Sequence, residues 1–270
     1  MLEKPLIAIE NLLHKYNKRL GPESLQIIMI NFDEAANLVL SENDNRFHAL
    51  RRILSTLINT CLWTTFLSTN SAIEVLAPKL KHERSDRVAR GLVIRLPPFT
   101  AFKLNLENDT LEANNGTREL SRPINSLGTI EHVSKFGRPL WKAYAGGSED
   151  SNYDWNIIRF VHNKLVGSGN FDPNDENHVF AVLSFRISLD PITNVPSAEL
   201  CKNAVDFHLR ALVSMDSRNR ILETITPSEP LVADIAAQIL NGRFTPNNAS
   251  LWPDTLRKLA GNLLGGGKVD

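Results

Sequence analysis

Cysteine is scarce in this chain, and neither sign of charge predominates. Its 270 residues include two cysteines, Cys61 and Cys201, which are too few for a disulfide framework and lack the paired Cys/His spacing of a zinc site. The 30 basic residues, lysine and arginine, are balanced by 30 acidic residues, aspartate and glutamate, so the formal net charge is zero. Because generic binding to nucleic acid or to an anionic membrane normally requires a basic excess, the composition gives no strong nucleic-acid signal.

Long apolar runs and familiar hydrolytic or metal-binding motifs are also absent from the sequence. No run approaches the roughly 18 apolar residues that span a bilayer, and the N-terminal segment has no signal-peptide core. We therefore expect no membrane partner and an intracellular protein, either cytoplasmic or nuclear. The seven histidines form no His-x-x-x-His pair, and no Gly-x-Ser-x-Gly sequence occurs. Hydrophobic residues at 42% and charged residues at 22% are ordinary for a globular protein.

The first hundred residues contain short apolar runs that alternate with amphipathic segments. Residues 25–32 and 61–67 are typical of strands buried on both faces, and residues 92–96 form a third such run, closed by two prolines. Residues 5–20 and 46–60 carry apolar side chains at helical spacing. Because strands that alternate with helices form parallel sheets, we predict an α/β fold with a parallel sheet in this part of the chain.

The remainder of the chain is predicted to be mainly helical. Residues 127–145 include a helical stretch, and residues 146–155 form a linker. Apolar spacing predicts four further helices, near residues 155–167, 177–188, 197–212 and 229–241. A β-hairpin is predicted within residues 212–224, between the last two helices. Ser228 is predicted to cap the last helix, with Pro230 near its first position.

Two acidic residues, Asp33 and Glu34, directly follow the first predicted strand. In parallel sheets, ligands bind outside the carboxyl ends of the strands. At such a position Asp33 can hold Mg²⁺, which prefers oxygen ligands and bridges substrate phosphates, and Glu34 can act as the general base for water. An apolar strand followed by Asp-Glu is the Walker B pattern. The alternative interpretation is a helix N-terminus, where acidic side chains interact favourably with the helix dipole.

Small polar residues end the second predicted strand in the same way. Ser68, Thr69 and Asn70 follow it, and the 37 positions between Asp33 and Asn70 (70 − 33) leave room for one crossover helix. P-loop NTPases of the AAA+ and STAND type carry a polar sensor at the end of the strand after Walker B. That resemblance implies that Thr69 or Asn70 senses the γ-phosphate or positions water. The alternative is a simple strand-end turn, which also favours these residue types.

The segment Phe136-Gly137-Arg138-Pro139-Leu140-Trp141 resembles the Gly-x-Pro-Leu motif in the helical lid of STAND NTPases, where the proline-bearing turn packs near the nucleotide base. The resemblance implies that Gly137 and Pro139 shape the lid and that Arg138 approaches phosphate. The alternative is a helix kinked at its proline. The order of the motifs matches the STAND class over residues 25–145.

A narrower resemblance covers most of the chain. Several segments are similar to a set of uncharacterised fungal proteins related to the NTPase-bearing Crinkler-type proteins of fungi and oomycetes. The segments are Asp33-Glu34-Ala35, Phe66-Leu67-Ser68-Thr69-Asn70-Ser71, Leu96-Pro97-Pro98-Phe99-Thr100, the Gly137 segment and Pro227-Ser228-Glu229-Pro230. The resemblance implies an ATPase-like regulatory module that uses ATP and Mg²⁺ and is sometimes joined to nuclease or other effector domains.

The sequence departs from these families because it has no P-loop, Gly-x-x-x-x-Gly-Lys-Ser/Thr. The nearest segment, Gly265-Gly266-Gly267-Lys268-Val269, lacks the Ser/Thr. In the family, a strand, a helix and usually another strand separate the P-loop from Walker B, whereas only 32 residues precede Asp33 here. We therefore expect a truncated gene model, a fragment or a decayed copy, or a chain in which residues 1–20 rearrange to cover the gap. In each of these cases the P-loop is absent, so we expect the chain alone to bind ATP weakly or not at all.

Three regions follow from these observations: a partial P-loop NTPase core in residues 1–98, a helical lid in residues 99–145, and an α-rich, winged-helix-like region in residues 150–270. The resulting hypothesis is that the chain is the C-terminal portion of a STAND/AAA+-like ATPase regulatory module and is not catalytic alone, because the P-loop is absent. The alternative is a non-catalytic protein-interaction or effector-type module that retains a degenerate NTPase scaffold. We expect a protein partner or self-association in either case.

Overall fold

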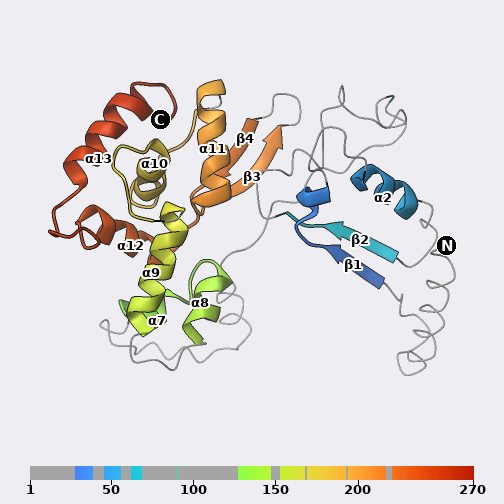
Figure 1. Cartoon of the computed structure of the whole chain (residues 1–270), viewed down its shortest axis with the longest axis horizontal. Coiled ribbons are helices and arrows are strands. Elements are labelled where there is room, and N and C mark those ends of the chain that lie inside the picture. The colour runs from blue at the N-terminus through green and yellow to red at the C-terminus, as the bar shows by residue number, and fades with distance from the viewer. Residues whose placement is uncertain are drawn as a thin grey trace, which may run out of the picture. The chain divides into compact units, whose positions relative to one another are not determined.

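The computed structural model describes residues 28–38, 46–55, 62–68, 90, 127–146, 153–167, 169–192, 194–216 and 221–270 (Figure 1). These residues form eight α-helices and two small sheets, so the fold is mixed α/β. The chain divides into two compact units, Met1–Arg84 and Ser85–Asp270. The predicted helix at 5–20 and strand at 92–96 lie outside the described residues. Among the described helices, none is both long enough and apolar enough to cross a bilayer.

The first unit contains two parallel strands. β1 (Ile28–Phe32) and β2 (Leu62–Phe66) pair in parallel along their whole lengths, and α2 (Arg46–Ser55) lies between them in the chain. A short 3-10 turn, η2 (Ala35–Leu38), follows β1. Parallel strands need a crossover connection, because the chain must return to the same edge before it re-enters the sheet. The parallel arrangement predicted for these two strands is confirmed.

The two faces of this strand pair differ in burial. On one face, the Phe32 and Phe66 rings stack with centroids 5.0 Å apart, and the buried Phe47 of α2 meets Phe66 edge-on at 5.1 Å. On the other face, Met29 is 59% exposed and Trp63 is 62% exposed. The prediction that both faces of these strands are buried is therefore wrong, because the helix packs on the phenylalanine face and leaves Met29 and Trp63 open to solvent.

The second unit is built mainly of helices. They are α7 (Ile130–Val133), α8 (Pro139–Gly146), α9 (Tyr153–Val166), α10 (Glu176–Ser184), α11 (Val195–Phe207), α12 (Pro230–Leu240) and α13 (Trp252–Lys258), the last followed by a π-helical turn, η4 (Leu259–Leu264). The four helices predicted after residue 150 are confirmed as α9, α10, α11 and α12. Sequence periodicity missed α13, whose seven residues are too few for a clear apolar stripe.

α10 is the centre of the hydrophobic core. Six of its nine residues, from Val179 to Ser184, are buried, and the helix packs against α9, α11, α12 and η4 (Figure 1). A helix with apolar side chains on all sides belongs in an interior rather than on a surface. Trp141 of α8 and Leu263 of η4 are fully buried in the same cluster. The core therefore joins residues from both ends of the second unit.

The predicted hairpin is confirmed. β3 (Ala211–Asp216) and β4 (Ile221–Ile225) pair antiparallel, with a bulge between Leu212 and Ser214. Pro230 begins α12, as predicted, but the capping position is Glu229, whose side chain makes no cap hydrogen bond. The prediction that Ser228 caps this helix is wrong, because the chain enters the helix one residue later.

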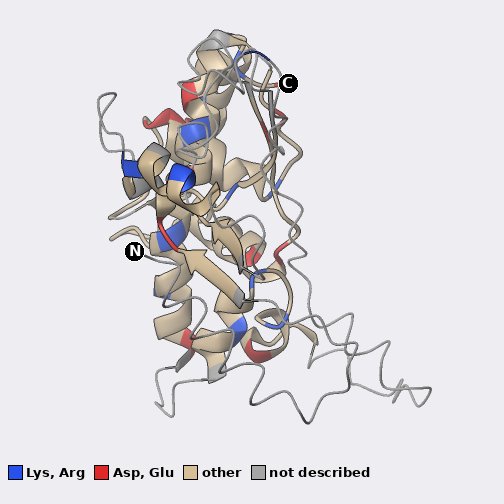
Figure 2. Ribbon diagram, turned by 90° about the vertical axis from the view of Figure 1, so that its right-hand side faces the viewer, with Lys and Arg blue, Asp and Glu red and all other residues tan. Residues whose placement is uncertain are grey.

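Charged side chains tie the last turns of the chain to α10. Glu176 forms ion pairs with Lys268 and with Lys258, and it accepts a 3.0 Å hydrogen bond from Asn262. The Lys268 hydrogen bond is the main cause that lowers the pKa of Glu176. Elsewhere, acidic and basic residues are interspersed along the described ribbon (Figure 2). This distribution agrees with the zero net charge.

Two histidines, His162 of α9 and His208 at the end of α11, are buried in the second unit. The His208 Nδ1 lies 2.8 Å from the carbonyl oxygen of Leu165, so this nitrogen carries the proton and donates it. The His162 Nε2 is buried and has no hydrogen-bond partner in the described part of the chain. Burial lowers the pKa of both imidazoles. Both side chains are therefore held neutral in the folded protein near pH 7.

We expect the free energy of unfolding to decrease as the pH falls from about 7.5 to about 5.5. Below the ordinary histidine pKa of 6.5, the unfolded chain binds protons at His162 and His208 that the folded chain does not. Stability that is present above this pH is therefore lost below it. Urea unfolding followed by circular dichroism measures the change.

The variants His162→Phe and His208→Gln identify the groups responsible. Each should make the unfolding free energy less dependent on pH in this range, whatever its effect on stability at pH 7.5. The Glu176 carboxyl, with its lowered pKa, titrates below this range. If both variants keep the full pH dependence of the parent chain, the buried histidines are not its cause.

Candidate functional site

Asp33 and Glu34 lie at the carboxyl end of β1, as the sequence predicted. The Leu67 N–H donates to the Phe32 carbonyl at 2.8 Å, and the Ala35 N–H donates to the Leu67 carbonyl at 2.8 Å. These two bonds join the chain just after β1 to the chain just after β2. The acidic pair and Ser68 therefore lie at the same edge of the strand pair. Thr69 and Asn70 lie outside the described residues.

The acidic pair occupies a tight turn. Glu34 has φ of 49°, in the left-handed region, and its N–H donates to Asp33 Oδ1 at 2.9 Å. A non-glycine residue in this region costs about 1–2 kcal/mol, so the neighbouring contacts must hold it there. Both side chains are exposed. The turn places two carboxylates in solvent beyond the strand end.

The oxygen donors at this edge suit Mg²⁺ better than a soft metal. Asp33, Glu34 and Ser68 supply carboxylate and hydroxyl oxygens, the ligand types that Mg²⁺ binds. No group of three or more His, Cys, Asp or Glu side chains with the geometry of a metal site occurs in the described part of the chain. A Mg²⁺ ion here would take its other ligands from water and phosphate, as Mg²⁺ sites with one or two carboxylates do.

The second predicted site, Gly137-Arg138-Pro139, connects α7 to α8. Pro139 begins α8 and does not kink a helix. The Arg138 backbone N–H donates to Glu229 Oε2 at 3.3 Å, and its guanidinium forms an ion pair with the same carboxylate and donates to the Leu209 carbonyl. The Arg138 side chain is 20% exposed. Its charged group is therefore already bound by other parts of the second unit.

Glu229 is the residue that sequence reasoning did not identify. Its side chain is 0% exposed, and it accepts hydrogen bonds from Arg138 and from the indole N–H of Trp141. Burial raises the pKa of Glu229, and the Arg138 charge opposes that effect. The two residues are 91 positions apart, so no local pattern links them. The only signal was that both lie in segments named in the same family resemblance.

Gly137 is required by this contact. Its φ is +90°, and a Cβ at this position would lie 2.6 Å from Glu229 Cγ. Only glycine adopts this backbone conformation readily, and only glycine leaves space for the carboxylate. The Gly-Arg-Pro segment therefore acts as the binding site for a buried glutamate within the same unit.

Comparisons with known proteins identify no relative of this chain. No protein-family model matches the chain, and comparisons with curated proteins and with solved structures find no significant match either. The assignment of a function therefore depends on the geometry of the two sites.

Arg138→Met should destabilise the protein by about 3 kcal/mol, because breaking a buried ion pair leaves an uncompensated charge. The double variant Arg138→Met/Glu229→Gln should recover a large part of this loss, since neither member of the pair then leaves a buried charge without its partner. Chemical denaturation of the three chains measures both effects.

Arg257→Met is the matched control. Arg257 pairs with Asp254 one turn away, and both side chains are largely exposed, at 75% and 56%. Loss of such a surface pair should change the unfolding free energy by less than about 1 kcal/mol. Equal destabilisation by Arg138→Met and Arg257→Met would show that the buried contact with Glu229 contributes no more to the free energy of unfolding than an exposed ion pair does.

Proposed function

We propose that the chain is the C-terminal portion of a STAND/AAA+-like ATPase regulatory module and that its first unit carries the edge facing Mg²⁺ and ATP. The single observation that supports this proposal is the parallel pairing of β1 with β2. This pairing brings Asp33, Glu34 and the end of β2 to one carboxyl edge, where ligands of parallel sheets bind. A helix N-terminus alone would explain the acidic pair but not its position beside the second strand end.

In this proposal each residue of the edge has a separate task. Asp33 holds Mg²⁺, which neutralises phosphate charge, and Glu34 accepts a proton from the attacking water. Thr69 or Asn70 contacts the γ-phosphate. Because the sequence has no P-loop, residues that cradle the phosphates are missing, and the chain alone binds ATP weakly and does not turn it over.

The remaining regions complete the module in this proposal. Gly137, Arg138 and Pro139 belong to the helical lid, and the order of α11, the β3–β4 hairpin and α12 suits a winged-helix-like region. Regulation in such a module works through a protein partner or through self-association inside the cell. These assignments depend on the family resemblance together with the order of the elements.

A second candidate, a non-catalytic interaction module on a degenerate NTPase scaffold, is favoured by one observation. Arg138, the lid arginine, already forms an ion pair with the buried Glu229 and a hydrogen bond with the Leu209 carbonyl. A guanidinium used in this way is not available to a phosphate unless the Glu229 contact breaks. In this candidate the Gly-Arg-Pro segment stabilises the fold and binds no nucleotide.

Titration with ATP followed by backbone NMR separates the two candidates. For the ATPase module we expect shifts of the Asp33, Glu34 and Ser68 signals that require Mg²⁺ and saturate with a Kd on the order of 1 mM. Asp33→Ala should abolish these shifts, because it removes the proposed metal ligand.

Asp154→Ala, which removes an exposed carboxylate from the first turn of α9, is the control and should leave the shifts unchanged. Absence of any saturable shift at the strand edge in a folded chain would overturn the nucleotide proposal and favour the interaction module.

A further inference from the structure

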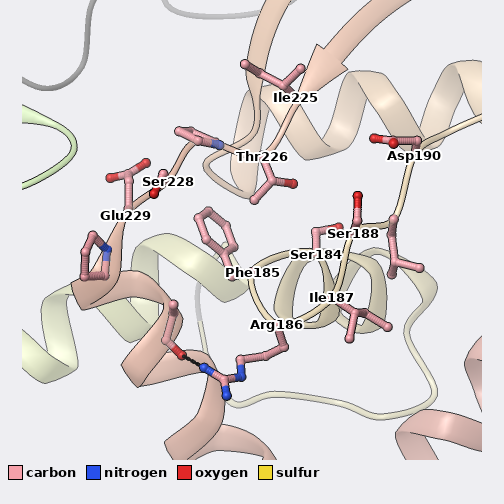
Figure 3. A pocket seen from close by; sticks show the side chains of 14 residues that line it. Ser184, Phe185, Arg186, Ile187, Ser188, Asp190, Ile225, Thr226, Ser228 and Glu229 are labelled. Carbon is pink, nitrogen blue, oxygen red and sulfur yellow. Dashed lines mark hydrogen bonds between the residues drawn. The ribbon is translucent and has the colours of Figure 1, made fainter.

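A cavity of about 600 Å³ lies in the second unit, between the segment that follows α10 and the segment that joins β4 to α12 (Figure 3). Residues 184–190 form one wall, and residues 225–230 with Ala233 form the other. The volume falls in the range of pockets that hold small ligands. None of its lining residues belongs to the nucleotide edge proposed above.

A buried cation holds the two walls together. Arg210 is 4% exposed and donates to Thr226 Oγ1 at 2.7 Å on one wall and to Ser184 Oγ at 3.5 Å on the other. It also donates to Thr224 at the end of β4 and lies over the Phe180 ring of α10. A guanidinium with this many partners fixes the positions of the side chains that it contacts. The cavity is therefore a preorganised space with a positive charge directly behind its wall.

The positive charge of Arg210 is only partly neutralised. Its carboxylate partner is Asp190, 3.5 Å away, whose side chain is 75% exposed, so solvent screens the attraction between the two charges. Glu229 also lines the cavity, but its carboxylate is bound by Arg138 and Trp141. Arg186 adds a second cation at the rim, where it is exposed and donates to the Ala233 carbonyl at 3.3 Å. The cavity therefore favours an anion.

Hydroxyl groups supply hydrogen-bond donors inside this positive environment. Ser188 makes no hydrogen bond within the described part of the chain, and Thr226 accepts from Arg210 and so keeps its own proton to donate. Both hydroxyls and the Asp190 carboxylate point into the same space from opposite walls (Figure 3). Apolar surface lies next to them, because the Phe185 ring and Ile225, which is 51% exposed, also line the cavity.

We propose that this cavity binds an aliphatic carboxylate. The carboxylate accepts hydrogen bonds from Ser188 and Thr226 in front of the buried Arg210, and the aliphatic part lies against Phe185 and Ile225. The same chemistry is presented by a free short-chain acid and by the C-terminal leucine of a peptide. A carboxylate can accept hydrogen bonds from both hydroxyls and is attracted by the positive charges of Arg210 and Arg186. A neutral amide lacks the negative charge and so lacks this attraction.

NMR of the full chain with labelled isoleucine methyl groups tests the proposal. The probes are 4-methylpentanoate for the free acid, N-acetylleucine for the peptide terminus, and N-acetylleucinamide as the uncharged match of the second. We expect the Ile225 and Ile187 signals to shift with saturation at a Kd on the order of 1 mM for at least one acid. The amide should bind at least tenfold more weakly. The methyl signal of Ile239, a core residue outside the cavity lining, should not move.

The relative affinity of the two acids identifies the source of the carboxylate. Tighter binding of N-acetylleucine supports a peptide terminus, and tighter binding of 4-methylpentanoate supports a free acid. Absence of a saturable shift with either acid, or equal binding of acid and amide, overturns the proposal.

Two substitutions at the rim should change the affinity in opposite directions. Arg186→Gln should weaken acid binding severalfold, because it removes a cation, and Asp190→Asn should strengthen it, because it removes a carboxylate that repels the ligand. Arg257→Gln, an exposed arginine outside the cavity, should leave binding unchanged. Binding that is unaffected by both rim substitutions, in chains whose spectra remain folded, also overturns the proposal.

Discussion

The buried carboxylate of Glu229 is the constraint on which the second unit depends. Removing an ion from water costs several kcal/mol, and the cost is offset only when the partners have good geometry. Here the guanidinium of Arg138 and the indole of Trp141 serve as partners, and both come from one five-residue stretch. That stretch needs Gly137 at positive φ, because a Cβ would collide with Glu229. One carboxylate thus sets how α8 and α12 begin and how they approach each other.

Arg210 is a buried charge of the opposite sign, and polar partners likewise offset the cost of its burial. Its guanidinium is satisfied by hydroxyl and carbonyl oxygens from the end of α10 and from β4 and the residue that follows it. Arg138 also donates to the carbonyl of Leu209, the residue before Arg210. The two buried charges therefore belong to one continuous set of polar contacts beside the apolar core. The cavity lies along these contacts, which hold its walls in place although most of the lining residues belong to the segments between α10 and α11 and between β4 and α12.

The first unit depends on backbone pairing rather than on buried charge. Its parallel strands bring two chain segments more than thirty residues apart to one edge, and the hydrogen bonds of Ala35 and Leu67 hold the turns beyond the strands. The charged side chains at this edge, Asp33 and Glu34, remain exposed. The buried charges of the second unit are instead bound by other residues of the same unit. This contrast is why the acidic edge, and not the Gly-Arg-Pro segment, carries the nucleotide proposal.

The local pattern of the sequence by itself determined the helices from α9 to α12 and the β3–β4 hairpin, because apolar spacing and turn residues act over a few neighbouring positions. The alternation of apolar runs with a helical segment also predicted that β1 and β2 are parallel, because a crossover helix between two strands favours parallel pairing. It also placed the acidic pair at a strand end. Only the tertiary structure decided that Arg138 binds Glu229, that Arg210 is buried, and that Ser228 does not cap α12. The reason is physical: a buried charge finds its partner through packing between distant segments, and no periodicity or spacing in the chain encodes which segments those are.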